Sequence, residues 1–223
     1  MGKYQVAEKF ISINGEGMRA GQPAVFIRFK GCNLRCSYCD TRWANGEDCP
    51  SELMTEEEIA EYIISCGVKC VTLTGGEPML RDGFTELCLR LEKINDLRIE
   101  IETNGSVDIS GLAAVRGKAV SFTMDYKLPS SCMEAEMNTG NMRYLTENDT
   151  VKFVCGGRED LDRAYEVICS YGLDKRCNTL FSPVFSRIEP VKIVDFILEK
   201  KLMRSRFQLQ LHKFIWDPEK RGV

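Results

Sequence analysis

The sequence predicts an α/β fold, an open, partial βα barrel with about six parallel strands. Strand-like and helix-like segments alternate along nearly the whole chain, which is the order of βα units in a parallel sheet. About six such units are too few to close an eight-unit barrel. No internal repeat or low-complexity linker divides the 223 residues, so we expect one domain over residues 1–223.

The first elements are identified by their periodicity and their end signals. Residues 24–30 alternate apolar and polar side chains, as a half-buried strand does. Residues 55–66 begin with a capping box, Thr55 with Glu58, and place apolar side chains on one face, which predicts a helix. The β-branched run 68–74 is predicted to be a strand that ends in a tight Gly-Gly turn.

The same alternation continues to the C-terminus. The next predicted elements are a helix over 83–94, strands over 98–103, 119–125 and 150–155, a helix over 159–171 and a strand over 178–184. Pro190 begins a helix that reaches about Lys201, because proline suits the first helical position. Residues 206–214 alternate strictly and are predicted to form the last strand. The polar stretch 129–149 is expected to be an insertion or flap outside the core.

Composition excludes several classes of protein. Hydrophobic residues make up 43% and charged residues 28%, which is typical of a globular chain. A net charge of −3 argues against nucleic-acid binding, and no apolar run approaches the roughly 18 residues of a membrane span. The N-terminus has no apolar signal core. Eleven cysteines, an odd number, fit a reducing cytoplasm better than a disulfide scaffold.

Three cysteines mark the first candidate site. Cys32, Cys36 and Cys39 follow the first predicted strand with the spacing C-x3-C-x2-C. A tight loop with this spacing can direct three thiolates to one place, and cysteine thiolates hold iron–sulfur clusters. Three ligands for four irons leave one iron with an open position, which indicates cofactor or substrate chemistry. The spacing alone also allows a structural zinc site completed by Cys49 or His212.

With Gly75-Gly76-Glu77-Pro78 at the end of the next strand, the cysteine triplet resembles the radical S-adenosylmethionine superfamily. The resemblance implies that superfamily's partial barrel and a [4Fe–4S] cluster on the three cysteines. It implies that the open iron binds S-adenosylmethionine and that reductive cleavage gives a 5′-deoxyadenosyl radical. A one-electron donor such as flavodoxin or ferredoxin is then required.

Further segments resemble the 7-carboxy-7-deazaguanine synthase family. They are Ser12 to Gly17, Gly21 to Phe29, Cys39-Asp40-Thr41 and Gln208 to Lys213. The resemblance implies conversion of 6-carboxy-5,6,7,8-tetrahydropterin to 7-carboxy-7-deazaguanine in queuosine and deazapurine biosynthesis. Hydrogen abstraction at C6, ring contraction and loss of ammonia would follow, assisted by Mg²⁺, in a homodimer. The family usually has Gln where this chain has Asn14, and many relatives have Ser where it has Asp125.

The same resemblance assigns roles to residues of this chain. Thr41 would bind Mg²⁺, which prefers oxygen ligands. Arg28 has a planar guanidinium that suits the substrate carboxylate. The substrate-binding residues would be Ile13, Asn14, Gly15, Glu16, Arg28, Thr74 and His212. The residues that bind S-adenosylmethionine would be Tyr38, Cys39, Asp40, Gly75, Gly76, Glu77, Asn104, Asp125, Tyr126, Lys127, Ser182, Pro183, Val184 and Phe185.

Two other functions remain open at this point. A glycyl-radical-enzyme activase shares the short chain and the cysteine spacing, but it commonly has Cys-His-Asn in place of Cys39-Asp40-Thr41. A non-catalytic iron–sulfur or zinc protein would have no need for the Gly-Gly-Glu-Pro turn. Both alternatives predict that the tetrahydropterin is not converted.

Overall fold

The computed structural model describes residues 3–223, and within them one nine-stranded sheet has the order β3-β1-β2-β4-β5-β6-β7-β8-β9. From β2 to β9 each neighbouring pair is parallel, whereas β1 pairs antiparallel with β2 and β3. The mostly parallel open sheet confirms the predicted fold class. The strands are β1 (Lys3–Ile13), β2 (Pro23–Phe29), β3 (Glu52–Thr55), β4 (Cys70–Gly75), β5 (Arg98–Thr103), β6 (Val120–Tyr126), β7 (Thr150–Cys155), β8 (Asn178–Pro183) and β9 (Ser205–Phe207).

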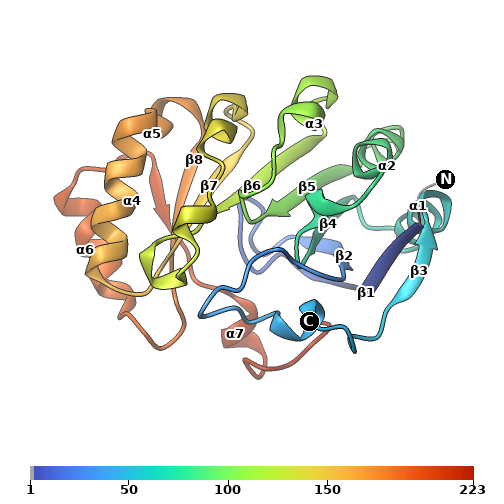
Figure 1. Ribbon diagram of the computed structural model, residues 1–223, viewed down its shortest axis with the longest axis horizontal. Coiled ribbons are helices and arrows are strands. Elements are labelled where there is room, and N and C mark those ends of the chain that lie inside the picture. The colour runs from blue at the N-terminus through green and yellow to red at the C-terminus, as the bar shows by residue number, and fades with distance from the viewer. Residues whose placement is uncertain (1–2) are drawn as a thin grey trace.

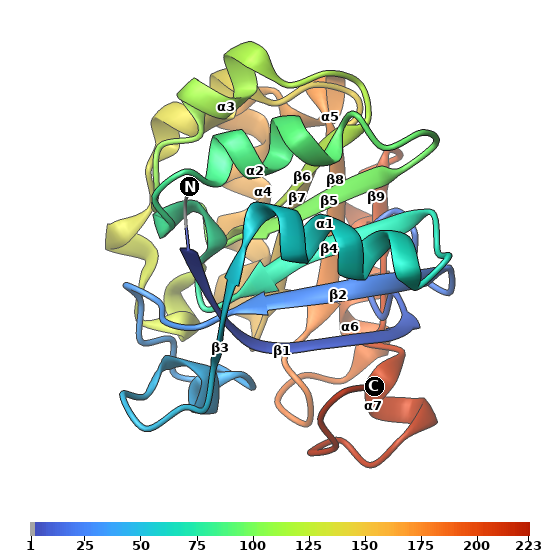
Figure 2. The ribbon, with the colours of Figure 1, turned by 90° about the vertical axis from the view of Figure 1, so that its right-hand side faces the viewer.

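Most helices cover the outer face of the curved sheet, while the segment after β2 and helix α7 both lie at the bottom of the view in Figure 1. The helices are α1 (Glu56–Ser65), α2 (Phe84–Leu91), α3 (Ser110–Val115), α4 (Arg158–Tyr171), α5 (Leu173–Arg176), α6 (Pro190–Glu199) and α7 (His212–Ile215). Figure 2 shows α1 and α2 packed along the outer side of β4 and β5. Within residues 3–223, every helix is too short or too polar to cross a bilayer.

Local signals predicted several boundaries well. The capping box of α1 is present, since the Thr55 hydroxyl accepts from the Glu58 amide and the Glu58 carboxylate accepts from the Thr55 amide. Helix α4 ends at Gly172, whose φ of 59° is the left-handed conformation that glycine adopts without strain. Helix α6 begins at Pro190, as predicted.

The prediction of a strand over 206–214 is wrong. Only Ser205–Phe207 forms a strand, and His212–Ile215 is a short helix. The chain leaves the sheet at Gln208, whose side chain exchanges two hydrogen bonds with the backbone of Gly17, at 2.7 and 2.9 Å. Gln208, Gln210 and His212 therefore contact the loop after β1, whereas Arg206 is exposed.

The segment 129–149 also differs from the expectation that it lies outside the core. It forms three short 3-10 helices, and Asn141 and Met142 are buried. Asn141 donates to the backbone carbonyls of Gly105 and Val107, at 3.2 and 2.8 Å. The polar residues of this segment thus satisfy buried backbone groups, which composition alone does not reveal.

A buried ion pair fixes the starts of β6 and β7. Asp149 is fully buried and accepts two hydrogen bonds from the Arg116 guanidinium, each 2.6 Å long. The same carboxylate accepts from the backbone amides of Phe122 and Thr146, both at 2.8 Å. The bidentate geometry and the added amide donors offset the cost of removing both charges from water.

We expect Asp149→Ala to lower the free energy of unfolding by about 3–5 kcal/mol, because it leaves the buried Arg116 charge without its partner. The measurement is the urea midpoint at constant slope. Asp162→Ala is the control, since Asp162 pairs with Arg158 on the surface of α4 and its loss should barely move the midpoint. Equal midpoint shifts in the two variants would contradict the assignment.

Candidate active site

The carboxyl ends of the parallel strands open into a cavity of about 870 Å³. Thr74 at the end of β4, Glu102 at the end of β5 and Asp125 at the end of β6 line one wall. Another wall is formed by the loop after β2 together with α7, where Lys213 of α7 lies 3.4 Å from Asp40 of the loop. Strand ends of a parallel sheet converge on one edge, so residues far apart in sequence meet here.

Three free cysteines reach this cavity from residues 30–39, which we call the cluster loop. Cys32, Cys36 and Cys39 all line the cavity. Burial raises the pKa of the Cys36 and Cys39 thiols, and the charge of Lys127 opposes that rise. Asn104 donates to the Cys32 sulfur at 3.5 Å. Three thiols on one loop beside an open volume suit the ligand set of an iron–sulfur cluster.

The structure separates Cys49 from these three thiols. Its sulfur contacts the carbonyl of Pro50 at 3.3 Å, and it is absent from the cavity lining. In the described part of the chain, no three His, Cys, Asp or Glu side chains are grouped to hold one metal ion. A cluster takes its thiolates on different irons, so its sulfurs do not need to meet at one ion.

Two glycines bring the end of β4 against the cluster loop. The Gly76 amide donates to the Phe29 carbonyl and the Glu77 amide to the Gly31 carbonyl, both at 3.0 Å. A Cβ atom at Gly75 would overlap the Phe29 backbone, and one at Gly76 would overlap the Gly31 carbonyl. Only glycine allows the two backbones to come this close, so packing alone already requires Gly75 and Gly76.

The Glu77 side chain lies behind the cavity wall and not in the cavity. Its carboxylate is fully buried and accepts from the Thr103 hydroxyl at 2.8 Å and the Asn104 amide at 2.6 Å. Burial raises the pKa of Glu77 to about 7, against the opposing effect of these donors. Glu77, predicted to bind S-adenosylmethionine, therefore joins the ends of β4 and β5, and it does not line the cavity.

A network of buried charges forms another part of the wall. The Lys152 ammonium lies 3.1 Å from Asp125 and 3.3 Å from Glu16, and Lys127 lies 2.8 Å from Asp125. Burial alone would lower the pKa of Lys152, but Asp125, Glu16 and Glu102 hold it well above its ordinary value. Burial would likewise raise the pKa of Asp125, but the two lysines hold it low. Asp125, Lys127 and Lys152 therefore stay charged near neutral pH.

Lys152 was missed in the sequence. The only signal was a lysine inside the apolar run of β7, Thr150–Cys155. Gln210, Lys213 and the segment 218–223 were also missed, and all of them line the cavity. Gln210 donates to Glu16 at 3.2 Å.

Several residues predicted to bind substrate lie together at the cavity. Arg28 projects from β2 and pairs with Glu8 at 2.8 Å. His212 lies against Gly15, so close that a Cβ atom on Gly15 would clash with its ring. Burial lowers the pKa of His212, although Glu16 opposes this shift. The residues of this predicted set that line the cavity are Ile13, Gly15, Glu16, Arg28, Thr74 and His212.

Most of the residues predicted to bind S-adenosylmethionine or Mg²⁺ line the cavity. Thr41 lines the cavity, and its hydroxyl donates to Asp40 at 3.0 Å, while Lys213 lies 3.4 Å from the same carboxylate. Burial would raise the pKa of Asp40, but Lys213 and Thr41 hold it below its ordinary value. Those of the cofactor set that line the cavity are Tyr38, Cys39, Asp40, Gly75, Gly76, Asn104, Asp125, Lys127, Val184 and Phe185.

Other predicted residues point elsewhere. The Asn14 side chain is buried and accepts from the Thr72 hydroxyl at 2.8 Å. The Tyr126 ring packs on Phe153, with 6.0 Å between centroids. Ser182 is fully buried and donates to Glu16 at 3.3 Å. These side chains support the wall, because their polar atoms are already engaged or face the core.

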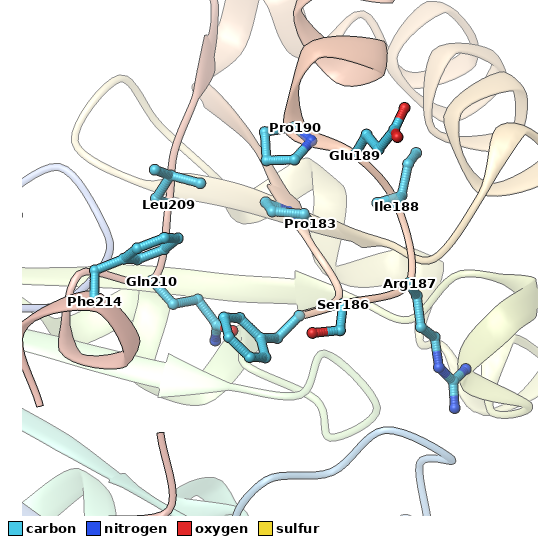
Figure 3. A pocket seen from close by; sticks show the side chains of 10 residues that line it. Pro183, Ser186, Arg187, Ile188, Glu189, Pro190, Leu209, Gln210 and Phe214 are labelled. Carbon is cyan, nitrogen blue, oxygen red and sulfur yellow. The ribbon is translucent and has the colours of Figure 1, made fainter. Parts of the chain in front are cut away.

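Pro183 belongs to a second, smaller and mainly apolar pocket of about 360 Å³ next to the first. Figure 3 shows Pro183, Leu209, Gln210 and Phe214 around it. Phe185 lines both pockets, so the turn after β8 separates the two volumes.

Comparison with known proteins agrees with this geometry. Residues 26–126 match the Radical SAM superfamily. A 7-carboxy-7-deazaguanine synthase of Clostridium acetobutylicum is 54% identical over 220 residues, 99% of each chain. Another, of Chlorobaculum tepidum, is 34% identical over 98% of this chain and 96% of its own. The crystal structure of QueE from Escherichia coli has the same fold, with a TM-score of 0.74 at 22% identity over 93% of each chain. On these grounds the chain belongs to the 7-carboxy-7-deazaguanine synthase family of the radical S-adenosylmethionine superfamily.

Proposed function

We propose that this enzyme converts 6-carboxy-5,6,7,8-tetrahydropterin to 7-carboxy-7-deazaguanine with loss of ammonia. The observation that carries the proposal is one cavity shared by three free cysteines, the Gly75-Gly76 turn and Arg28. The chain is also 54% identical, over 99% of its length, to a protein of that name. A glycyl-radical-enzyme activase is not favoured.

The chain supplies ligands, orientation and a fixed electrostatic field. Cys32, Cys36 and Cys39 would hold a [4Fe–4S] cluster, which with S-adenosylmethionine supplies the adenosyl radical chemistry that removes hydrogen from C6. Arg28 would bind the substrate carboxylate with its free terminal nitrogens, because its Nε is already engaged by Glu8. The Glu8 partner would hold the guanidinium in place.

Glu16 would meet the substrate's nitrogen-bearing edge. Its carboxylate is held by Lys152 at 3.3 Å and by Gln210 at 3.2 Å, on the loop that follows β1. A fixed carboxylate can accept hydrogen bonds from ring and amino N–H groups, which orients a flat heterocycle.

The proposal also includes an electron donor, a cellular location and an oligomeric state. A one-electron donor such as flavodoxin or ferredoxin and a homodimer follow from family resemblance, and a cytoplasmic location follows from the eleven cysteines. Exposed apolar side chains on α6 and α7, including Leu198 and Phe214, offer surface for a second subunit. One hydrophobic cluster runs from Tyr4 to Leu202, which supports a single domain.

We expect Cys36→Ala to abolish cluster binding and product formation while the chain still folds. After anaerobic reconstitution the unmodified protein should hold about four irons per chain, and the variant should lose most of this iron. Cys169→Ala is the control, because Cys169 is exposed on α4. Wild-type iron content and turnover in Cys36→Ala would contradict the ligand assignment.

Arg28→Ala should weaken substrate binding roughly 10- to 100-fold, the loss expected for a hydrogen bond between charged groups. Equilibrium binding of the tetrahydropterin to the reconstituted enzyme measures this, with iron content unchanged. Arg90→Ala removes a comparable ion pair, with Glu57, far from the cavity and should leave affinity intact. Unaltered affinity in Arg28→Ala would remove Arg28 from the substrate site.

Omission of Mg²⁺ should lower kcat/KM by about tenfold, if an ion held by the Thr41 hydroxyl offsets the negative charge of a bound anion. Thr41→Val should show the low rate with or without Mg²⁺, and Thr41→Ser, which keeps the hydroxyl, should respond as the unmodified enzyme does. Equal Mg²⁺ responses in Thr41→Val and the unmodified enzyme would exclude Thr41 as a ligand.

A further inference from the structure

Three arginines donate hydrogen bonds to the backbone of the cluster loop, and none of them was predicted to be a site residue. We call Arg35, Arg42 and Arg81 the arginine triad. Arg35 donates through one terminal nitrogen to the carbonyls of Cys32 at 2.7 Å and Leu34 at 2.8 Å. Its guanidinium therefore lies next to the backbone that carries a cluster ligand.

The other two arginines approach the same loop from different segments. Arg42 donates to the carbonyls of Cys36 and Ser37, at 3.2 and 3.3 Å. Arg81 follows the Gly-Gly-Glu-Pro turn and donates to the Lys30 carbonyl at 3.0 Å. Five carbonyls of the loop are thus bound by three guanidinium groups.

The positive charge of the triad is not balanced by acidic partners. Among residues 3–223, none of the three has a carboxylate oxygen within 4.0 Å, whereas Arg28, Arg116 and Arg163 do. The Nε of Arg81 is buried and has no hydrogen-bond acceptor. Arg81 is partly buried and acts through a region of reduced dielectric, whereas Arg35 and Arg42 are exposed and are screened more by solvent, so Arg81 should act most strongly on its surroundings.

We propose that the arginine triad raises the reduction potential of the [4Fe–4S] cluster. The inference rests on the proposed function, because it requires the cluster on the three cysteines. Three thiolates leave the oxidised cluster with net negative charge, and one electron from the donor makes it more negative. Nearby positive charge stabilises the reduced form more than the oxidised form. The three arginines are positioning residues, since they touch the loop and not the reacting atoms.

The test is an EPR-monitored redox titration of the reconstituted full-length enzyme and its Arg35→Gln, Arg42→Gln and Arg81→Gln variants. Loss of the Arg81 charge should lower the ratio of reduced to oxidised cluster at fixed potential about tenfold, which for one electron is about 59 mV, and loss of the exposed Arg35 or Arg42 charge should lower this ratio by less, in the same direction. The matched control is Arg98→Gln, which removes the same charge at the first residue of β5, the opposite end of the strand from Asn104. Its potential should equal that of the unmodified enzyme.

Lysine variants separate charge from loop geometry. Arg35→Lys, Arg42→Lys and Arg81→Lys keep the charge and should keep the potential of the unmodified enzyme. Potentials in the glutamine variants equal to that of Arg98→Gln would overturn the inference, and so would lysine variants that fall as far as their glutamine counterparts. If a glutamine variant takes up no iron, recovery of iron by its lysine counterpart supports the role of charge, and failure to recover overturns it. Absence of iron from the unmodified protein would instead overturn the proposed function, and this inference with it.

Discussion

The hydrogen bonds between the end of β4 and the cluster loop set the geometry of the whole site. Gly76 and Glu77 donate to the Phe29 and Gly31 carbonyls, and no side chain fits between the two backbones. Because β4 is also paired in parallel with β2 and β5, the loop is fixed relative to the ends of the other strands. The cysteine ligands and the strand-end side chains are therefore parts of one rigid edge.

Charged side chains are paired on the strand side of the cavity, whereas the arginine triad on the loop side has no acidic partner among residues 3–223. On the strand side, Lys152 is balanced by Asp125 and Glu16 in a closed network, so the wall carries fixed charges that need no rearrangement when a ligand binds. On the loop side, guanidinium groups bind backbone carbonyls and keep their charge unbalanced. A balanced wall suits orientation of a polar substrate, and an unbalanced one suits an anionic redox centre.

Prediction from sequence succeeded where the information is local. The capping box of α1 and the β-branched run of β7 depend on neighbouring residues, and both elements are where they were predicted. Prediction from sequence failed where a contact with a residue far along the chain determines the local structure. Gln208 follows a strand pattern, yet its side chain binds Gly17 and draws the chain out of the sheet. Glu77 was located by its motif, but its orientation depends on the amide of Asn104, which no spacing rule encodes.

Trp43 gives the cavity an intrinsic fluorescence probe, and Arg221 of the C-terminal segment lies over its ring. The chain has two tryptophans, and Trp43 lines the cavity with the Arg221 guanidinium 4.2 Å above its ring. A guanidinium stacked on an indole is held by the ring quadrupole, so a change in its position changes the surroundings of the ring. Emission from Trp43 therefore reports on the mouth of the cavity, so ligand entry can be followed by intrinsic fluorescence without any attached dye.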